Sequence, residues 1–253
     1  MPNAKKRPEK FPAMKTPALV GLAIMALSSI VVAQLVLQPG MPVTDISTGS
    51  CTLGFPAGYY IFTTAGHCFN VGTRLYVGST YIGYVSKREV PTSTNPNNPS
   101  TDLAAISLSQ ANSAAYSPQL YHTSSECSSL TGPPYLVKGY ARESSYLFFQ
   151  NAPVIFNGAT SGCIVVYVRY LPRTYPLDSY YVRAFLVDPR MAKGDSGAPA
   201  ALTNACYISN TPVWIGGTHS ARAYYINQYY GYEVTVEYGS ARLSITPTPT
   251  NWS

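Results

Sequence analysis

Three short motifs contain the residue types of nucleophilic catalysis. They run from Thr63 to Cys68 (TTAGHC), from Thr101 to Ala104 (TDLA) and from Gly194 to Pro199 (GDSGAP). A serine hydroxyl is a poor nucleophile at neutral pH and needs a base, which the imidazole of a histidine can supply. A carboxylate on the other ring nitrogen fixes the tautomer and stabilises the imidazolium that forms. Taken singly, a histidine can be structural and a Gly-Asp-Ser-Gly stretch can be a plain turn. The three motifs together favour a serine hydrolase.

The elements that must position these motifs are predicted to be β-strands. Charged residues make up only 11% of the 253 residues, whereas the chain has 22 Tyr, 21 Pro and 19 Gly. From residue 48 onward, short apolar and aromatic runs alternate with turn residues, which is typical of antiparallel barrels and sandwiches. The runs that we predict as strands cover residues 59–64, 74–77, 81–85, 103–108, 135–141, 163–168, 180–187, 213–217 and 232–238.

The motifs and their order resemble those of the chymotrypsin-like serine peptidases. The likeness covers about residues 48–243, and the segment from Ser47 to Phe55 resembles the start of mature enzymes of the streptogrisin and α-lytic branch. This resemblance implies an all-β, trypsin-like fold of two antiparallel six-stranded β-barrels with the active site between them. We expect the barrels at residues 46–125 and 126–245, followed by a tail at 246–253.

The resemblance also assigns roles to residues of the motifs. It implies that His67 is the general base, Asp102 its orienting carboxylate and Ser196 the nucleophile. The backbone N–H groups of Gly194 and Ser196 would form the oxyanion hole, which stabilises the charge that develops on the carbonyl oxygen.

Further structural pairings are implied by the family. Cys51 and Cys68 would form a disulfide beside the histidine. A buried carboxylate needs a partner, and Asp195 directly precedes the serine. Bacterial members use an internal arginine, and because residues 137–142 resemble the strand that carries it, we expect Arg142 to pair with Asp195. The pairing of Cys127, Cys163 and Cys206 stays open.

The specificity pocket would be lined by residues on both sides of the nucleophile. On one side are Arg190 and Lys193, and on the other are His219, Ser220 and Arg222. By the resemblance, Ser220 contacts the catalytic carboxylate and His219 lies on the pocket wall, as in glutamate-specific members. The positive charges would favour an acidic side chain. A shift of one residue in the alignment would instead leave the pocket undefined.

The N-terminal region predicts export. The net charge is +6, of which +4 lies in the first fifteen residues, so the remainder gives little support for nucleic-acid binding. A basic cytoplasmic head at 1–17 precedes a hydrophobic, membrane-targeting helix at 18–37. It is either a signal peptide, with a small-residue cleavage site at Val31–Ala33, or a membrane anchor.

These features predict an extracellular serine endopeptidase, either secreted or tethered to the cell membrane. It would hydrolyse peptide bonds of polypeptide substrates through an acyl-enzyme, as a monomer, without a cofactor or metal. Two alternatives stay open: an esterase with the same three residues, and a non-catalytic surface or binding protein on a peptidase fold.

Overall fold

The computed structural model describes residues 35–47, 49–58, 60–109, 119–121, 135–203 and 212–248. All of them belong to one unit, Leu35–Ser253. The basic head, residues 18–34 of the expected targeting segment, the end of the tail, Cys127 and Cys206 lie outside the described residues. The described part contains no helix with the length and apolar character of a membrane span.

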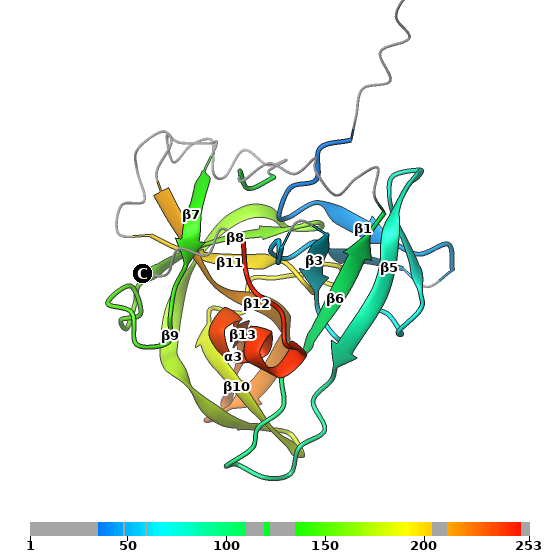
Figure 1. The fold of residues 1–253 in the computed structure, drawn as a ribbon. Coiled ribbons are helices and arrows are strands. Elements are labelled where there is room, and N and C mark those ends of the chain that lie inside the picture. The colour runs from blue at the N-terminus through cyan, green and yellow to red at the C-terminus, as the bar shows by residue number, and fades with distance from the viewer. Residues whose placement is uncertain are drawn as a thin grey trace, which may run out of the picture. The chain divides into compact units, whose positions relative to one another are not determined.

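The first sheet has six antiparallel strands, drawn in blue to green in Figure 1, in the order β2-β1-β4-β5-β6-β3. Backbone hydrogen bonds from Gly54 N–H to the Thr63 carbonyl (2.7 Å) and from Thr63 N–H to the Phe55 carbonyl (3.0 Å) link its two ends. The strands are β1 (Pro42–Thr44), β2 (Ser50–Thr52), β3 (Ile61–Thr64), β4 (Arg74–Val77), β5 (Thr80–Glu89) and β6 (Leu103–Leu108).

The second sheet has seven strands in the order β11-β8-β9-β10-β13-β12-β7, and a pairing of β11 with β12 closes six of them into a ring. β7 adds to β12 in parallel, whereas the other pairings are antiparallel. The strands are β7 (Leu136–Tyr140), β8 (Pro153–Gly158), β9 (Gly162–Leu177), β10 (Tyr180–Val187), β11 (Pro199–Leu202), β12 (Pro212–Tyr225) and β13 (Gln228–Thr235).

The mostly-β, trypsin-like architecture predicted from the sequence is confirmed, but three details differ. The body begins before residue 46, because Leu37 is fully buried in the core of the first sheet, together with Val43 and Leu53. The strand expected at 232–238 ends at Thr235, and α3 (Val236–Leu243) follows it. The second sheet also has one strand more than expected, because β7 lies outside the ring.

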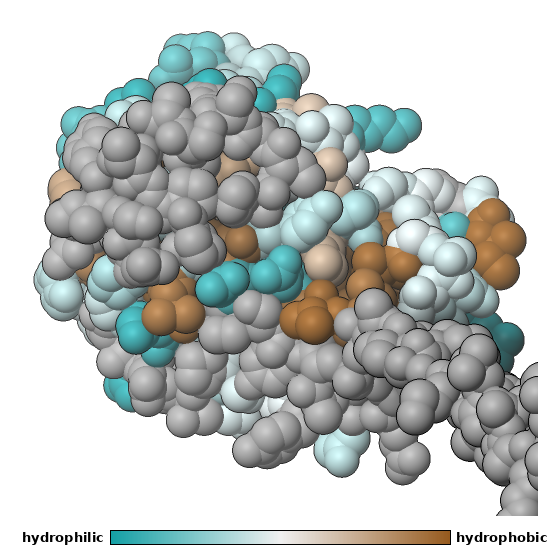
Figure 2. Space-filling model, turned by 90° about the horizontal axis from the view of Figure 1, so that it is seen from above, coloured by the Kyte–Doolittle hydropathy of each residue, from teal (hydrophilic) through white to brown (hydrophobic). Residues whose placement is uncertain are grey.

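Apolar side chains of both sheets pack into buried cores, yet some large apolar side chains are exposed. On the face shown in Figure 2, hydrophobic residues emerge in separate places among hydrophilic ones. Tyrosines of the second sheet account for several exposed side chains, including Tyr224 and Tyr229. Scattered exposed apolar residues are ordinary in soluble proteins, so only those next to the candidate site bear on function.

Candidate active site

Strand pairing in the first sheet brings two of the motifs together. Thr64 at the end of β3 lies opposite Ala104 near the start of β6. The residues just beyond these strand ends therefore leave the sheet at the same edge, and the His67 backbone N–H donates to Asp102 Oδ1 (2.8 Å). Gly66 makes this approach sterically feasible, because a Cβ there would lie 1.9 Å from the Glu89 carbonyl oxygen and 2.9 Å from Asp102 Oδ1.

The side chains of His67, Asp102 and Ser196 form one continuous hydrogen-bonded series. His67 Nδ1 lies 2.6 Å from Asp102 Oδ2, and His67 Nε2 lies 3.0 Å from Ser196 Oγ. The Asp102 side chain is 1% exposed and the His67 side chain 42% exposed, so the carboxylate is covered while the imidazole faces the open side. Ser220 anchors the series, since its hydroxyl donates to Asp102 Oδ2 and its carbonyl accepts from Ser196 Oγ (3.0 Å).

The surroundings of His67 shift its protonation equilibrium. Burial favours the neutral ring, but the hydrogen bond to Asp102 and the charge of that carboxylate outweigh burial and raise the pKa of His67 above its ordinary value. A neutral imidazole whose Nδ1–H donates to Asp102 has a free lone pair on Nε2. That lone pair faces the Ser196 hydroxyl, as a general base requires.

The loop before Ser196 is held in an unusual backbone conformation. Gly194 has φ +102°, in the region that only glycine adopts readily. Thr52 of β2 braces this loop, because its hydroxyl donates to the Gly194 carbonyl (3.0 Å) and its N–H donates to the Ser196 carbonyl (2.8 Å). The same hydroxyl accepts from the Ala159 N–H (3.0 Å). Our sequence predictions missed Thr52, although it directly follows Cys51 in the segment that resembles the family.

Asp195 is fully buried, and most of its described partners are backbone donors. Its carboxylate accepts hydrogen bonds from the N–H groups of Thr160, Ser161 and Ala192 (2.8, 3.0 and 2.7 Å) and from the Ser161 hydroxyl (2.5 Å). Arg142 is exposed and is not among these described donors, so its expected pairing with Asp195 stays a prediction. Three backbone N–H groups and one hydroxyl thus supply charge-assisted hydrogen bonds to the Asp195 carboxylate.

A cavity of about 320 Å³ opens beside Ser196. Its lining includes Lys193, His219 and Arg222 among the residues that we expected there, together with Met191, Ala192 and Ala221. The Arg222 guanidinium donates to the Met191 carbonyl. Arg190 is not part of this lining: its side chain is exposed and donates to the Val165 carbonyl (2.8 Å). Ser220 is buried behind the cavity at Asp102.

A buried acid lies behind the cavity. His219 Nδ1 is 2.8 Å from Glu233 Oε1, and both side chains are at most 4% exposed. Strand register explains the contact, because β12 and β13 pair His219 with Glu233. No local motif surrounds Glu233, which is fourteen residues from His219 along the hairpin. A second cavity, of about 410 Å³, is lined by residues other than those of the candidate site. Glu143 and Arg183 on its wall form an ion pair with each other.

The disulfide implied by the resemblance is present. Cys51 and Cys68 are joined, with a Cα–Cα distance of 6.3 Å, and connect β2 to the residue after His67. Cys163 is also disulfide-bonded, with a partner outside the described residues. Within the described ranges no group of three or more His, Cys, Asp and Glu residues could hold a metal ion.

Comparisons with known proteins are informative at the level of structure. No family model and no curated protein sequence matches the chain. Among solved structures, Thermobifida fusca Protease A is 19% identical with a TM-score of 0.60, covering 84% of this chain and 98% of its own. The Nocardiopsis protease NAPase is 17% identical (TM-score 0.60; 84% and 99% covered).

A third similar structure is a glutamic-acid-specific serine protease described as using a histidine triad in substrate binding. It is 15% identical with a TM-score of 0.56, and the match covers 83% of this chain and 98% of that one. Such identities establish the fold and leave the chemistry to be argued from the site. The chain thus has the fold of the chymotrypsin-like serine proteases.

Proposed function

We propose that this protein is an extracytoplasmic serine endopeptidase that hydrolyses peptide bonds through an acyl-enzyme. The observation that carries the proposal is the series from Asp102 through both nitrogens of His67 to the Ser196 hydroxyl, at 2.6 and 3.0 Å. Each distance lies within hydrogen-bonding range, so the proton can pass from Oγ to His67 Nε2 once the hydroxyl turns from the Ser220 carbonyl toward the ring.

In the first step, Ser196 Oγ attacks the carbonyl carbon of the scissile bond while its proton passes to His67 Nε2. Asp102 stabilises the resulting imidazolium. The N–H groups of Gly194 and Ser196 would donate to the oxyanion. Among the described hydrogen bonds, neither group has an acceptor within the protein.

In the second step, His67 returns the proton to the leaving amine as the C–N bond breaks. Water then attacks the acyl-enzyme with His67 again as base, which releases the carboxylic acid and restores Ser196. No step needs a metal or a cofactor.

The proposal is tested by labelling the secreted protein with a fluorophosphonate probe, which reacts with activated serines. We expect labelling of the natural chain and its loss in Ser196→Ala and His67→Ala. Ser47→Ala, at an exposed serine of the first sheet's loop, is the matched control and should label normally. Unchanged labelling of Ser196→Ala would contradict the proposal, and a labelled protein that cleaves esters but no peptide would indicate an esterase.

We further propose that the cavity beside Ser196 prefers an acidic side chain. Arg222 and Lys193 on its lining supply positive charge, and His219 supplies a ring nitrogen. The chain has three histidines, one of which is His67, so a set of three histidines is not available to this cavity. The buried partner of His219 is the carboxylate of Glu233, not another histidine.

Paired peptides with Glu or Gln at the cleavage position test this preference. Arg222→Gln should lower the Glu/Gln ratio of kcat/KM about tenfold, since a hydrogen bond to a charged group is removed. Arg74→Gln, at an exposed arginine on β4, is the control. A natural enzyme that prefers Lys, Arg or large apolar residues would refute an acidic pocket.

Export as a cleaved precursor is the third part of the proposal. Leu37 is fully buried in the first core and Leu35 packs against it, so both belong to the folded body. Residues 18–34 would span roughly 25 Å as a helix, short of the roughly 30 Å of a bilayer core. We therefore favour a signal peptide cut after Ala33 over an anchor. N-terminal sequencing should find Gln34 first, and an intact N-terminus on membrane-bound protein would contradict this.

A further inference from the structure

The hairpin formed by β12 and β13 extends beyond the candidate active site. It turns at Ile226 and Asn227, both of which have positive φ (45° and 66°). β11 pairs with β12 only up to Thr218, and β7 only up to Ile215. Within the described residues, the edge of β12 from Ala221 to Tyr225 that faces away from β13 therefore carries no strand. It begins next to Ser220, whose carbonyl accepts from Ser196 Oγ.

One face of this hairpin continues from the cavity into an exposed aromatic pair. Alternate residues of a strand share a face, so Tyr224 lies on the same face as Arg222. Tyr229 is directly opposite Tyr224, with ring centroids 5.1 Å apart and an interplanar angle of 63°. Tyr224 is 52% exposed and Tyr229 62% exposed. We call these two residues the tyrosine platform.

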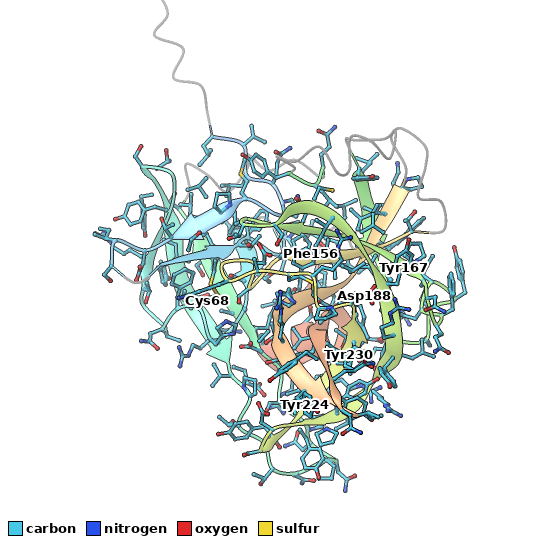
Figure 3. All side chains as sticks on the ribbon, turned by 180° about the vertical axis from the view of Figure 1, so that it is seen from behind. Cys68, Phe156, Tyr167, Asp188, Tyr224 and Tyr230 are labelled. Carbon is cyan, nitrogen blue, oxygen red and sulfur yellow. A yellow bond between two sulfur atoms is a disulfide. The ribbon has the colours of Figure 1, made fainter. Side chains whose placement is uncertain are left out.

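The opposite face of the hairpin is occupied. Tyr225 and Tyr230 each lie 5.3 Å, centroid to centroid, from Tyr170 of β9, and Tyr230 is only 4% exposed. Figure 3 shows Tyr224 further toward the end of the hairpin than Tyr230. The tyrosines of the hairpin thus divide into a packed set and the tyrosine platform, which faces solvent beside an open strand edge.

An extended peptide can add to an open strand edge through main-chain hydrogen bonds, with alternate side chains reaching surface sites. β11 is the strand that ends nearest to this open edge, and it pairs with β12 in antiparallel, so we expect the peptide to run antiparallel to β12 as well. If the residue whose carbonyl is attacked lies opposite Ser220, the residue four places before it lies opposite Tyr224, about 13 Å away at 3.3 Å per residue.

We propose that the tyrosine platform is a substrate-binding subsite for an aromatic or large apolar side chain, four residues before the residue at the cleavage position. This rests on the proposed peptidase function. The occupant is the upstream part of the substrate, because the open edge is continuous with the cavity beside Ser196. Edge-to-face contacts between aromatic rings stabilise such a complex, and their usual strength corresponds to about a three- to tenfold gain in kcat/KM.

The test uses quenched fluorescent peptides that share Glu at the cleavage position and differ four places upstream, where they carry Tyr, Ala or Glu. The natural enzyme should cleave the Tyr peptide about three- to tenfold more efficiently than the Ala peptide, chiefly through a lower KM. In Tyr224→Ala/Tyr229→Ala this ratio should approach one. Tyr146→Ala, at another exposed tyrosine, should keep it. Moving the tyrosine one place along the peptide should lose most of the gain, because the side chain then faces away.

Several results would overturn the subsite. Equal efficiency for the Tyr and Ala peptides, with an enzyme that labels with fluorophosphonate and cleaves both, would refute the subsite and leave the peptidase function standing. A gain only from tyrosines after the scissile bond would refute the antiparallel placement. An enzyme that neither labels nor cleaves any peptide would refute the proposed function, and the subsite would fall with it.

Discussion

Replacing Asp102 by asparagine should inactivate the enzyme through the tautomer of His67. Asp102 Oδ1 accepts from the backbone N–H of His67, which can only donate. The asparagine oxygen must therefore take that position, because an NH2 group there would face a donor. The NH2 group then takes the place of Oδ2, the atom that lies 2.6 Å from His67 Nδ1 in the natural protein. A donating amide forces Nδ1 to accept, so the ring proton moves to Nε2 and the lone pair facing Ser196 is lost.

The expected loss is about 10⁴-fold in kcat at neutral pH, the size found when this tautomer is reversed in other Ser-His-Asp enzymes, or about 5 kcal/mol of activation free energy. The rate of fluorophosphonate labelling measures it, because labelling requires the same proton transfer. A thermal melt checks that the fold survives. Asp188→Asn is the matched control, since Asp188 bonds to Arg169 (2.6 Å) on the outer part of the second sheet and should leave labelling unchanged. A loss of less than tenfold in Asp102→Asn would refute the reasoning.

Three further predictions concern pH, the disulfide and Thr52. Because Asp102 raises the pKa of His67, kcat/KM should fall as pH decreases through a value above 6.5, where the base becomes protonated; a midpoint below 6.5 in the pH profile would contradict this. Cys51→Ala/Cys68→Ala should lower the free energy of unfolding by about 3 kcal/mol in denaturant titrations, because the two residues are 17 apart in sequence; no change would refute a stabilising disulfide. Thr52→Val keeps the side-chain volume but removes the hydroxyl that hydrogen-bonds to both Gly194 and Ala159. It should lower the free energy of unfolding by about 1–3 kcal/mol and slow fluorophosphonate labelling. The control Thr80→Val, at an exposed strand end, should change neither quantity.

Where a strand is bounded by clear turn residues, the sequence predicted it closely. β4, β6 and β10 have the predicted bounds of 74–77, 103–108 and 180–187. β8 and β11 were missed because each begins with proline and β11 continues with two alanines, which are poor strand signals. α3 contains Val236 and Gly239, both weak helix formers, and its position depends on tertiary contacts, since Val236 and Leu243 pack in a buried core with Leu103 and Val213.

The candidate site divides in the same way. His67, Asp102 and Ser196 lie in local motifs, so the resemblance of those motifs to the chymotrypsin-like peptidases implied that the three residues lie together. The partners of Asp195 could not, because three of its four donors are backbone N–H groups, which have no residue identity to detect. Glu233 behind His219 depends on the register of a hairpin. Contacts that depend on strand register or on backbone donors can therefore be identified only from the structure.

The proposed mechanism requires an acyl-enzyme on Ser196, which can be trapped. The enzyme would be mixed with a peptide ester that has Glu at the cleavage position, and the reaction would be quenched with acid during turnover. The protein would then be digested and its peptides analysed by mass spectrometry. We predict an acyl mass increment on the peptide that contains Ser196, and its absence in His67→Ala. Acyl groups on another residue, or turnover that persists in Ser196→Ala, would contradict the mechanism.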